Sequence, residues 1–205
     1  MRIPSSPTRK RGLTLIELIM FIVVVGIAVA GILLVYTNTV RYSADPVVRK
    51  QMLAVAETML AETALMPFTF CDPDDAGAGS ARAALLGAGN CADTVEAIGP
   101  EQGESRYAVA DRFDNVNDYA AFDTNTAAPA GIADISGTVF DTLSGFRAQV
   151  SVNAQALGPA GSAIAATDRD GAPQVLLVTV KVTAPGGDAV SLSGYRTRYA
   201  PNAVP

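Results

Sequence analysis

The stretch RKRGLTLIELIMFIVVVGIAVAGILLVY, residues 9–36, decides the fold. Its first three residues are basic, and the apolar run of residues 13–36 has only Thr14 and Glu17 as polar interruptions. About 20 consecutive apolar residues are enough to cross the hydrocarbon core of a bilayer. Because an unpaired charge in that core is costly, a carboxylate found there usually serves a function. The stretch therefore predicts a membrane-spanning helix with one functional acid near its start.

The segment GLTLIEL, residues 12–18, follows the basic cluster directly. It resembles the class III leader of type IV pilins and of the pseudopilins of type II secretion systems, although Leu13 stands where the family usually has phenylalanine. The resemblance implies that an inner-membrane prepilin peptidase cuts after Gly12 and that the new amino terminus, at Leu13, is methylated. It also implies that Glu17 is the carboxylate used in filament assembly.

The chemistry of Glu17 supports such a role. A carboxylate in a medium of low dielectric constant must find a cationic partner or take up a proton. After removal of the leader, the free amine of Leu13 on a neighbouring subunit is a suitable partner, and the pair would fix the axial register of the two subunits. The alternative is that Glu17, only one turn inside the helix, extends to the membrane surface and has no role in assembly.

An ordinary signal peptide is a second interpretation of the same segment. Residues 28–30 read Ala-Val-Ala, a small-x-small site behind a basic and then an apolar region, so cleavage after Ala30 would release a soluble secreted domain. Against this interpretation, the apolar run continues through residues 32–35, and signal peptides seldom carry a glutamate near the start of their apolar region.

The charge distribution predicts the orientation in the membrane. Residues 1–12 contain Arg2, Arg9, Lys10 and Arg11 and no acid, in a chain whose formal net charge is −5. Positive charge beside a membrane helix marks the cytoplasmic side. We therefore expect a single-pass protein of a bacterial inner membrane with a periplasmic carboxy-terminal domain. The exported part is acidic, which argues against nucleic acid as a partner.

The two cysteines, Cys71 and Cys91, both lie in the part expected to be exported. In an oxidising compartment such a pair can close a loop of about twenty residues, which stabilises a fold by roughly 3 kcal/mol in the chain-entropy estimate. A zinc site or a catalytic thiol is less favoured, because metal-ligand spacing is missing and the chain has no histidine. We predict a Cys71–Cys91 disulfide.

Residues 37–66 are predicted to continue the first helix as an amphipathic segment. Apolar residues recur there at helical spacing, at Met52, Val55 and Met59, and this spacing indicates one buried stripe. Pro46, preceded by an aspartate, is typical of a helix start, so either a second helix begins there or the first helix bends.

The carboxy-terminal third contains the β signal. Three runs, residues 145–152, 175–183 and 190–199, alternate apolar and polar side chains and predict an antiparallel meander with one face on the helix. Residues 106–111 alternate more weakly and are a candidate for a further strand. The predicted fold is α+β and pilin-like, with a long amino-terminal helix packed on a small antiparallel sheet. Its expected parts are a cleaved leader (1–12), a transmembrane or filament-core helix (13–36), its amphipathic continuation (37–66) and a periplasmic globular β-domain (67–205).

An acidic loop raises the question of a metal. Carboxylate and amide oxygens gather at Asp114, Asn115, Asn117, Asp118 and Asp123, and calcium accepts several such ligands. The spacing lacks the glycine and the terminal glutamate of an EF-hand, and turns rich in Asn and Asp are common without metal. We expect no metal and no other cofactor, and calcium at these five residues is the alternative.

The sequence shows no catalytic motif. Histidine, a Gly-x-Ser-x-Gly nucleophile turn and a phosphate-binding glycine loop are all missing, so we expect a protein without enzymatic activity. The family resemblance implies a filament subunit. Further short likenesses, in residues 51–68, 113–119, 145–146 and 193–199, are to minor pilins of mannose-sensitive haemagglutinin (MSHA) pili.

The resemblance also implies the partners: other pilin subunits, the prepilin peptidase and methyltransferase, an inner-membrane assembly platform and membrane lipid. We expect a minor type IV pilin that takes part in pilus assembly or initiation. The alternatives are a minor pseudopilin of a type II secretion system and a secreted or anchored binding module that never polymerises.

Overall fold

A computed structural model describes residues 14–204, with only the helical backbone described for residues 38–45. The chain divides into two compact units between Val47 and Val48. One long helix, α1, runs from Leu15 to Leu65 and contributes to both units, and Pro46 lies inside it. Because proline has no backbone N–H, α1 lacks one hydrogen bond of its ladder at that point.

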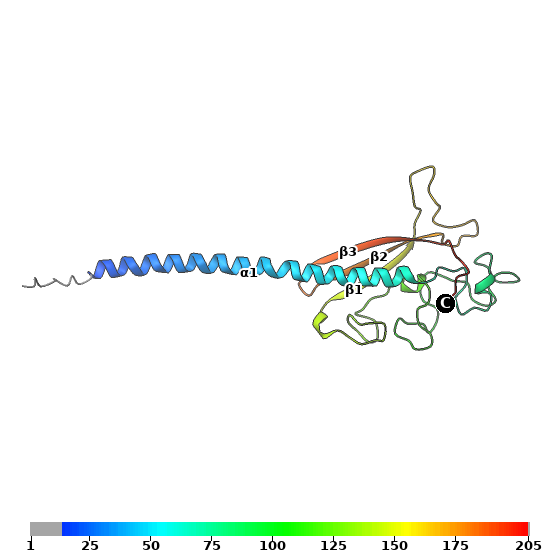
Figure 1. Cartoon of the computed structure of the whole chain (residues 1–205), viewed down its shortest axis with the longest axis horizontal. Helices are drawn as coiled ribbons and strands as arrows, with labels where there is room; N and C mark the ends of the chain where they lie inside the picture. Colours follow the sequence, from blue (N-terminus) through cyan, green and yellow to red (C-terminus); the bar gives the residue numbers. More distant parts are fainter. Residues whose placement is uncertain (1–13, 205) are drawn as a thin grey trace, which may run out of the picture. The chain divides into compact units, whose positions relative to one another are not determined.

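The second unit contains a three-stranded antiparallel sheet in the order β1-β2-β3 (Figure 1). Its strands are β1 (Arg147–Ala154), β2 (Val175–Thr183) and β3 (Ala189–Thr197). Val180 of β2 lies opposite Val150 of β1 and Leu192 of β3. The predicted meander is therefore confirmed, and so is the α+β, pilin-like fold.

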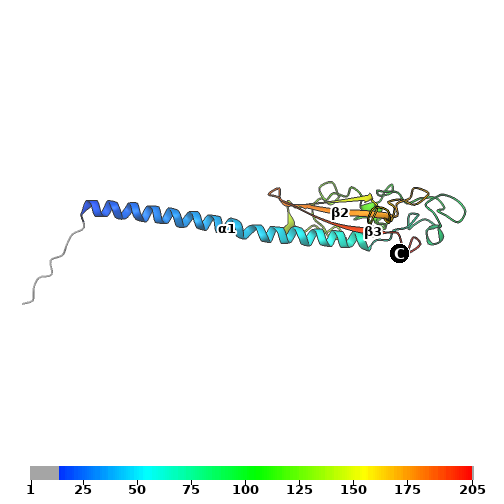
Figure 2. The same cartoon turned by 90° about the horizontal axis from the view of Figure 1, so that it is seen from above.

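The carboxy-terminal part of α1 lies along this sheet (Figures 1 and 2) and buries the predicted apolar stripe. Alternate residues of the strands face the helix, as a strand repeat of two requires. On β3, Leu60 packs over Gly194, and its methyl groups lie at ordinary van der Waals distances, 3.7 and 3.8 Å, from the position that an added Cβ would take. The shared core consists chiefly of Met52, Val55, Ala56 and Met59 from α1, of Ala148, Val150, Val152, Leu176, Val178, Val180 and Val182 from the sheet, and of Phe113, Tyr119 and Phe122 from a loop.

Most of the remaining chain of this unit is irregular. Three short 3-10 helices interrupt the loops: η1 (Ala78–Ser80), η2 (Asn117–Tyr119) and η3 (Asp141–Leu143). The connection between β1 and β2 extends away from the sheet (Figure 1). Residues 106–111 form turns, so the candidate strand there was wrong. Arg106 is buried in an ion pair with Glu62 of α1. This tertiary contact determines the local conformation, because the apolar–polar alternation of residues 106–111 is only a weak preference for a strand.

The predicted disulfide is present: Cys71 and Cys91 are joined, with their Cα atoms 5.4 Å apart. Asp75 organises the loop that they enclose. Its carboxylate accepts backbone N–H groups of Gly77 and of residues 92–94 at 2.7–2.8 Å. Burial acts to raise the pKa of Asp75, but these four donors outweigh it and hold the pKa well below its usual value.

Replacing Asp75 with alanine should lower the free energy of unfolding by about 1–3 kcal/mol, because four backbone donors lose their acceptor. The measurement is urea unfolding of the full chain in detergent, with the disulfide intact. Asp74→Ala is the matched control, since Asp74 is exposed on the same loop, and its effect should stay within about 0.5 kcal/mol. Equal effects of the two changes would contradict the role of Asp75.

Candidate functional sites: the amino-terminal motif and a buried carboxylate group

The amino-terminal site begins with the first turn of α1. Thr14 precedes the helix, and its hydroxyl oxygen accepts the backbone N–H of Glu17 at 3.4 Å, as at a helix N-cap. Glu17 is an acid in the first turn, where the positive end of the helix dipole favours negative charge. The predicted processing residues, Gly12 and Leu13, lie outside the described residues.

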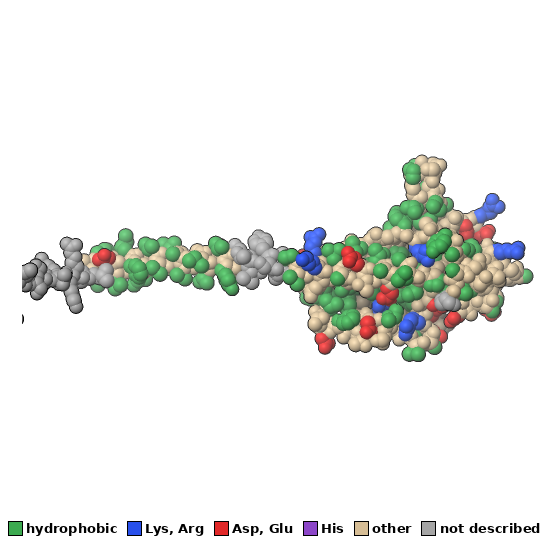
Figure 3. Space-filling model, in the orientation of Figure 1, with side chains coloured by type: hydrophobic (Ala, Val, Ile, Leu, Met, Phe, Trp, Pro, Cys, Tyr) green, Lys and Arg blue, Asp and Glu red, His purple; other side chains and the backbone are tan. Residues whose placement is uncertain are grey.

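The segment Leu15–Thr37 is long and apolar enough to cross a membrane. Its large apolar side chains are exposed within its own unit, and many of them are visible along the first part of α1 in Figure 3. Exposed apolar side chains on this scale require a lipid or protein environment. A single carboxylate, Glu17, stands at the start of this apolar surface.

A family model described as the prokaryotic N-terminal methylation motif matches residues 7–33. The chain therefore carries the class III prepilin leader of type IV pilins. The motif supports the pilin and pseudopilin family and points to a structural subunit rather than an enzyme. No curated protein and no solved structure matches the chain significantly.

The same motif implies processing by prepilin peptidase and assembly with other pilin subunits. Together with the exposed apolar helix, it fits a membrane-anchored protein that is incorporated into a pilus.

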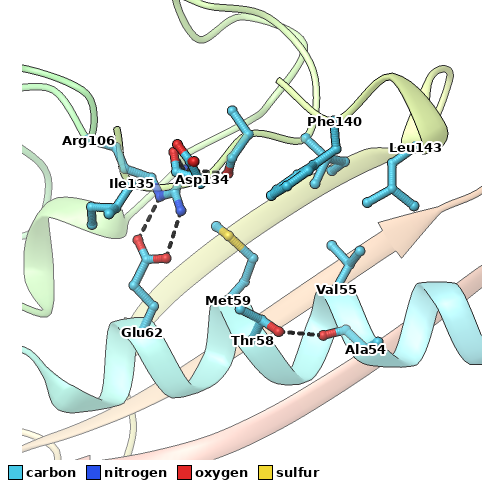
Figure 4. Close-up of a pocket in the computed structure, with 12 residues that line it drawn as sticks. Ala54, Val55, Thr58, Met59, Glu62, Arg106, Asp134, Ile135, Phe140 and Leu143 are labelled. Atoms are coloured by element: carbon cyan, nitrogen blue, oxygen red, sulfur yellow. Dashed lines mark hydrogen bonds and ion pairs between the residues drawn. The ribbon is translucent and has the colours of Figure 1, made fainter. Parts of the chain in front are cut away.

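In the second unit, a groove of about 430 Å³ lies between α1 and the loop that carries η3 (Figure 4). Met59 and Val55 line its floor, with Phe140 and Leu143 at one end. Glu62 and Arg106 close the other end. The lining is mostly apolar, and the ion pair supplies its strongest polar contact.

That ion pair is bidentate, with Nε and Nη2 of Arg106 each 2.6 Å from an oxygen of Glu62. The hydroxyl of Tyr119 donates to the same carboxylate at 2.8 Å, and Arg106 also donates to the carbonyl of Ala133. Burial acts to lower the pKa of Arg106, but the hydrogen bonds and charge of Glu62 raise it above its usual value. The arrangement ties two loops to α1, and both of its charged groups are paired.

A second group of charges lacks such pairing. One carboxylate oxygen from each of Glu96, Glu101 and Asp118 lies within 4.8 Å of the others. Asp72, Glu104 and Asp114 form another set of the same kind, and their charges act on the first set. Glu96 and Asp118 are almost fully buried, with 4% and 1% of their surfaces exposed.

Five carboxyl groups in these sets have raised pKa values: those of Glu96, Glu101, Glu104, Asp114 and Asp118. Burial, and then the charge of Asp118, raise the pKa of Glu96 to about 10. Burial is also the main reason why the pKa of Asp118 is about 8 and those of Glu104 and Asp114 are about 7. In each case the charges of other carboxylates add to the effect of burial.

The structure divides the five residues named as calcium candidates. Asp123 forms an ion pair with Arg147, which lowers its pKa, and so lies in a different environment. Asp114 and Asp118 belong to the two different carboxylate sets. The Asn115 amide donates to Thr69, and the buried side chain of Asn117 has no hydrogen-bond partner among the described residues.

Four of these acids were not predicted as site residues from the sequence: Asp72, Glu96, Glu101 and Glu104. They lie in the irregular connection that follows α1, in a region without helical or strand periodicity. In the sequence they are scattered acidic residues between positions 72 and 104. No sequence pattern indicates that this segment lies against residues 114–118.

The raised pKa values predict a pH dependence of stability. In the unfolded chain, Glu96 and Asp118 lose their protons near their ordinary pKa values of 4.5 and 3.8, whereas the folded chain keeps them to higher pH. Because the folded state binds more protons between these limits, the free energy of unfolding should fall as the pH rises from 5 to 8. For each such group, the free energy of unfolding can fall by at most about 1.4 kcal/mol per pH unit.

Urea unfolding of the full chain in detergent and EDTA, at pH 5 and pH 8, measures this effect. Carboxyl groups with lowered pKa values, such as those of Asp75 and Asp123, change the free energy of unfolding only below pH 5 and so do not affect this comparison. Glu96→Gln should reduce the slope, while Glu57→Gln, at an exposed position on α1, should leave it unchanged. Stability that is constant or rises from pH 5 to pH 8 would contradict the prediction.

Proposed function

We propose that the chain is a minor type IV pilin that enters a pilus through its amino-terminal helix. The leader, residues 1–12, is removed, and the helix of residues 13–36 spans the inner membrane and then joins the filament core. Residues 37–66 continue this helix, and residues 67–205 form the periplasmic domain. The observation that carries the proposal is the methylation motif at residues 7–33, which leads directly into an exposed apolar helix.

In this proposal Glu17 is the assembly contact. Its carboxylate pairs with the methylated amine of Leu13 on the neighbouring subunit. The pairing relieves two charges that are unfavourable in an apolar filament core, and it fixes the axial position of one helix against the next. Thr14 holds the first turn in place, which keeps Glu17 close to the helix end.

The partners follow from the same chemistry. Prepilin peptidase and its methyltransferase activity act on Gly12 and Leu13, an inner-membrane platform drives insertion, and other pilin subunits form the filament. The finer assignment is to the minor pilin D of MSHA pili, supported by the short likenesses at residues 113–119 and 193–199. A minor pseudopilin of a type II secretion system would carry the same leader.

Mass spectrometry of the mature protein tests the processing step. We expect a chain that begins with N-methylated Leu13, and we expect Gly12→Val to keep the leader because a bulky side chain crowds the scissile bond. Gly12→Ala is the conservative control and should be cut at least in part. A mature chain that begins at Gly31 would establish a signal peptide and overturn the proposal.

Filament incorporation tests Glu17. Glu17→Leu should remain in the membrane but fall at least tenfold in sheared filaments, because the amine of the neighbouring subunit loses its partner. The same substitution at Glu57, an exposed acid on the second part of α1, is the matched control and should be incorporated normally. Immunoblots of membrane and filament fractions give the ratio, and equal incorporation of both variants would remove the role from Glu17.

A further inference from the structure

Two separate loops bring Glu96, Glu101 and Asp118 together. The first loop carries Glu96, whose backbone N–H donates to the carbonyl of Phe70, and also Glu101. The second carries Asp118 within η2. The two loops are joined by the backbone hydrogen bond from Gly99 to the carbonyl of Asn117.

The oxygens at the centre of this group lack donors. Both carboxylate oxygens of Glu96 and Oδ1 of Asp118 are buried without a hydrogen-bond partner among the described residues. The other oxygen of Asp118 accepts the backbone N–H groups of Asp114 and Asn115 at 3.0 and 2.7 Å. Burial without a partner costs free energy for any polar group and more for a charge.

Among the described residues, no arginine or lysine forms an ion pair with these three carboxylates. Arg198 interacts with Glu96 only electrostatically; its guanidinium lies over the rings of Phe68 and Phe70, 3.6 Å from Asp168, and makes no hydrogen bond to the described residues. Arg106 is paired with Glu62. The second carboxylate set adds negative charge to the same region.

We propose that Glu96, Glu101 and Asp118 together bind one calcium ion. Calcium lies 2.3–2.6 Å from its oxygen ligands, so two ligands on opposite sides of the ion are about 4.6–5.2 Å apart. The three oxygens lie within 4.8 Å of one another, so all three can contact one ion of this size. Magnesium requires a near-ideal octahedron and usually keeps several waters, whereas calcium accepts several carboxylate ligands in a flexible arrangement, so three carboxylates from two loops favour calcium.

The ion would join the two loops. Glu96 lies next to Val95, which forms a β-bridge with Cys71, so the calcium site connects the disulfide-closed loop to the segment containing η2. Tyr119, the last residue of η2, is part of the core and bonds to Glu62 on α1. Calcium binding would therefore stabilise this unit whether or not the chain enters a filament.

Thermal unfolding of the full chain, with its disulfide intact and in detergent, tests the proposal. After removal of metal with EDTA, the wild-type protein should gain about 5–10 °C in its unfolding midpoint at a calcium concentration about 100-fold above the dissociation constant. Equilibrium dialysis with radioactive calcium should give one ion per chain.

Glu96→Gln keeps the shape of the side chain and removes its charge. It should lose the calcium-dependent gain and reduce calcium binding at least tenfold. Its midpoint in EDTA should equal or exceed that of the wild type, because glutamine, unlike Glu96, does not have to take up a proton when the chain folds. That second property shows that the variant folds. Asp118→Asn should lose the gain as well, and Glu57→Gln should keep it.

Three results would overturn the proposal. The first is no binding at millimolar calcium and pH 7.5, and the second is equal binding by the wild type and Glu96→Gln. The third is the same gain in midpoint with magnesium, or with choline chloride at equal ionic strength, which would show a less selective site or simple charge screening.

Discussion

The packing of one apolar face of α1 on the inner face of the sheet is the constraint on which the second unit depends. A sheet with one apolar face must bury that face against another element, and the helix supplies that second layer. Met52, Val55 and Met59 are spaced so that one stripe meets the strands. The same helix is therefore used twice, first as an apolar surface exposed within its own unit and then as half of a protein core.

With only three strands, the second unit must organise long loops by side-chain contacts. Asp75 gathers four backbone donors, and Glu62 holds Arg106 and Tyr119 against α1. In each of these contacts the charged side chain has a hydrogen-bonding or ionic partner, which compensates for the free energy lost when the charge leaves water. Glu96 and Asp118 are the exceptions, because they are buried beside other acids.

Regular elements were predictable from the sequence because their periodicity is local. The strands begin and end within two residues of the predicted runs, and the disulfide follows from two cysteines in a chain expected to be exported. The carboxylate group was not predictable, because it depends on which irregular loops meet in space. Arg106 shows the same limit, since its ion pair with a residue 44 positions earlier removed it from a weakly alternating run.

Protons and a divalent cation are alternative ways to neutralise the buried acids. A proton removes one charge and makes one carboxyl an O–H donor to a neighbouring oxygen, whereas calcium in the proposed site would neutralise two charges and occupy the acceptors of all three residues at once. Because both compete for the same oxygens, the affinity of the proposed calcium site at Glu96, Glu101 and Asp118 would fall as the pH falls. In this proposal, protonated carboxyls hold the loops together under acidic conditions, and the ion holds them together under neutral conditions. The contact between the loops would then be retained across a wider pH range than either form of neutralisation allows alone.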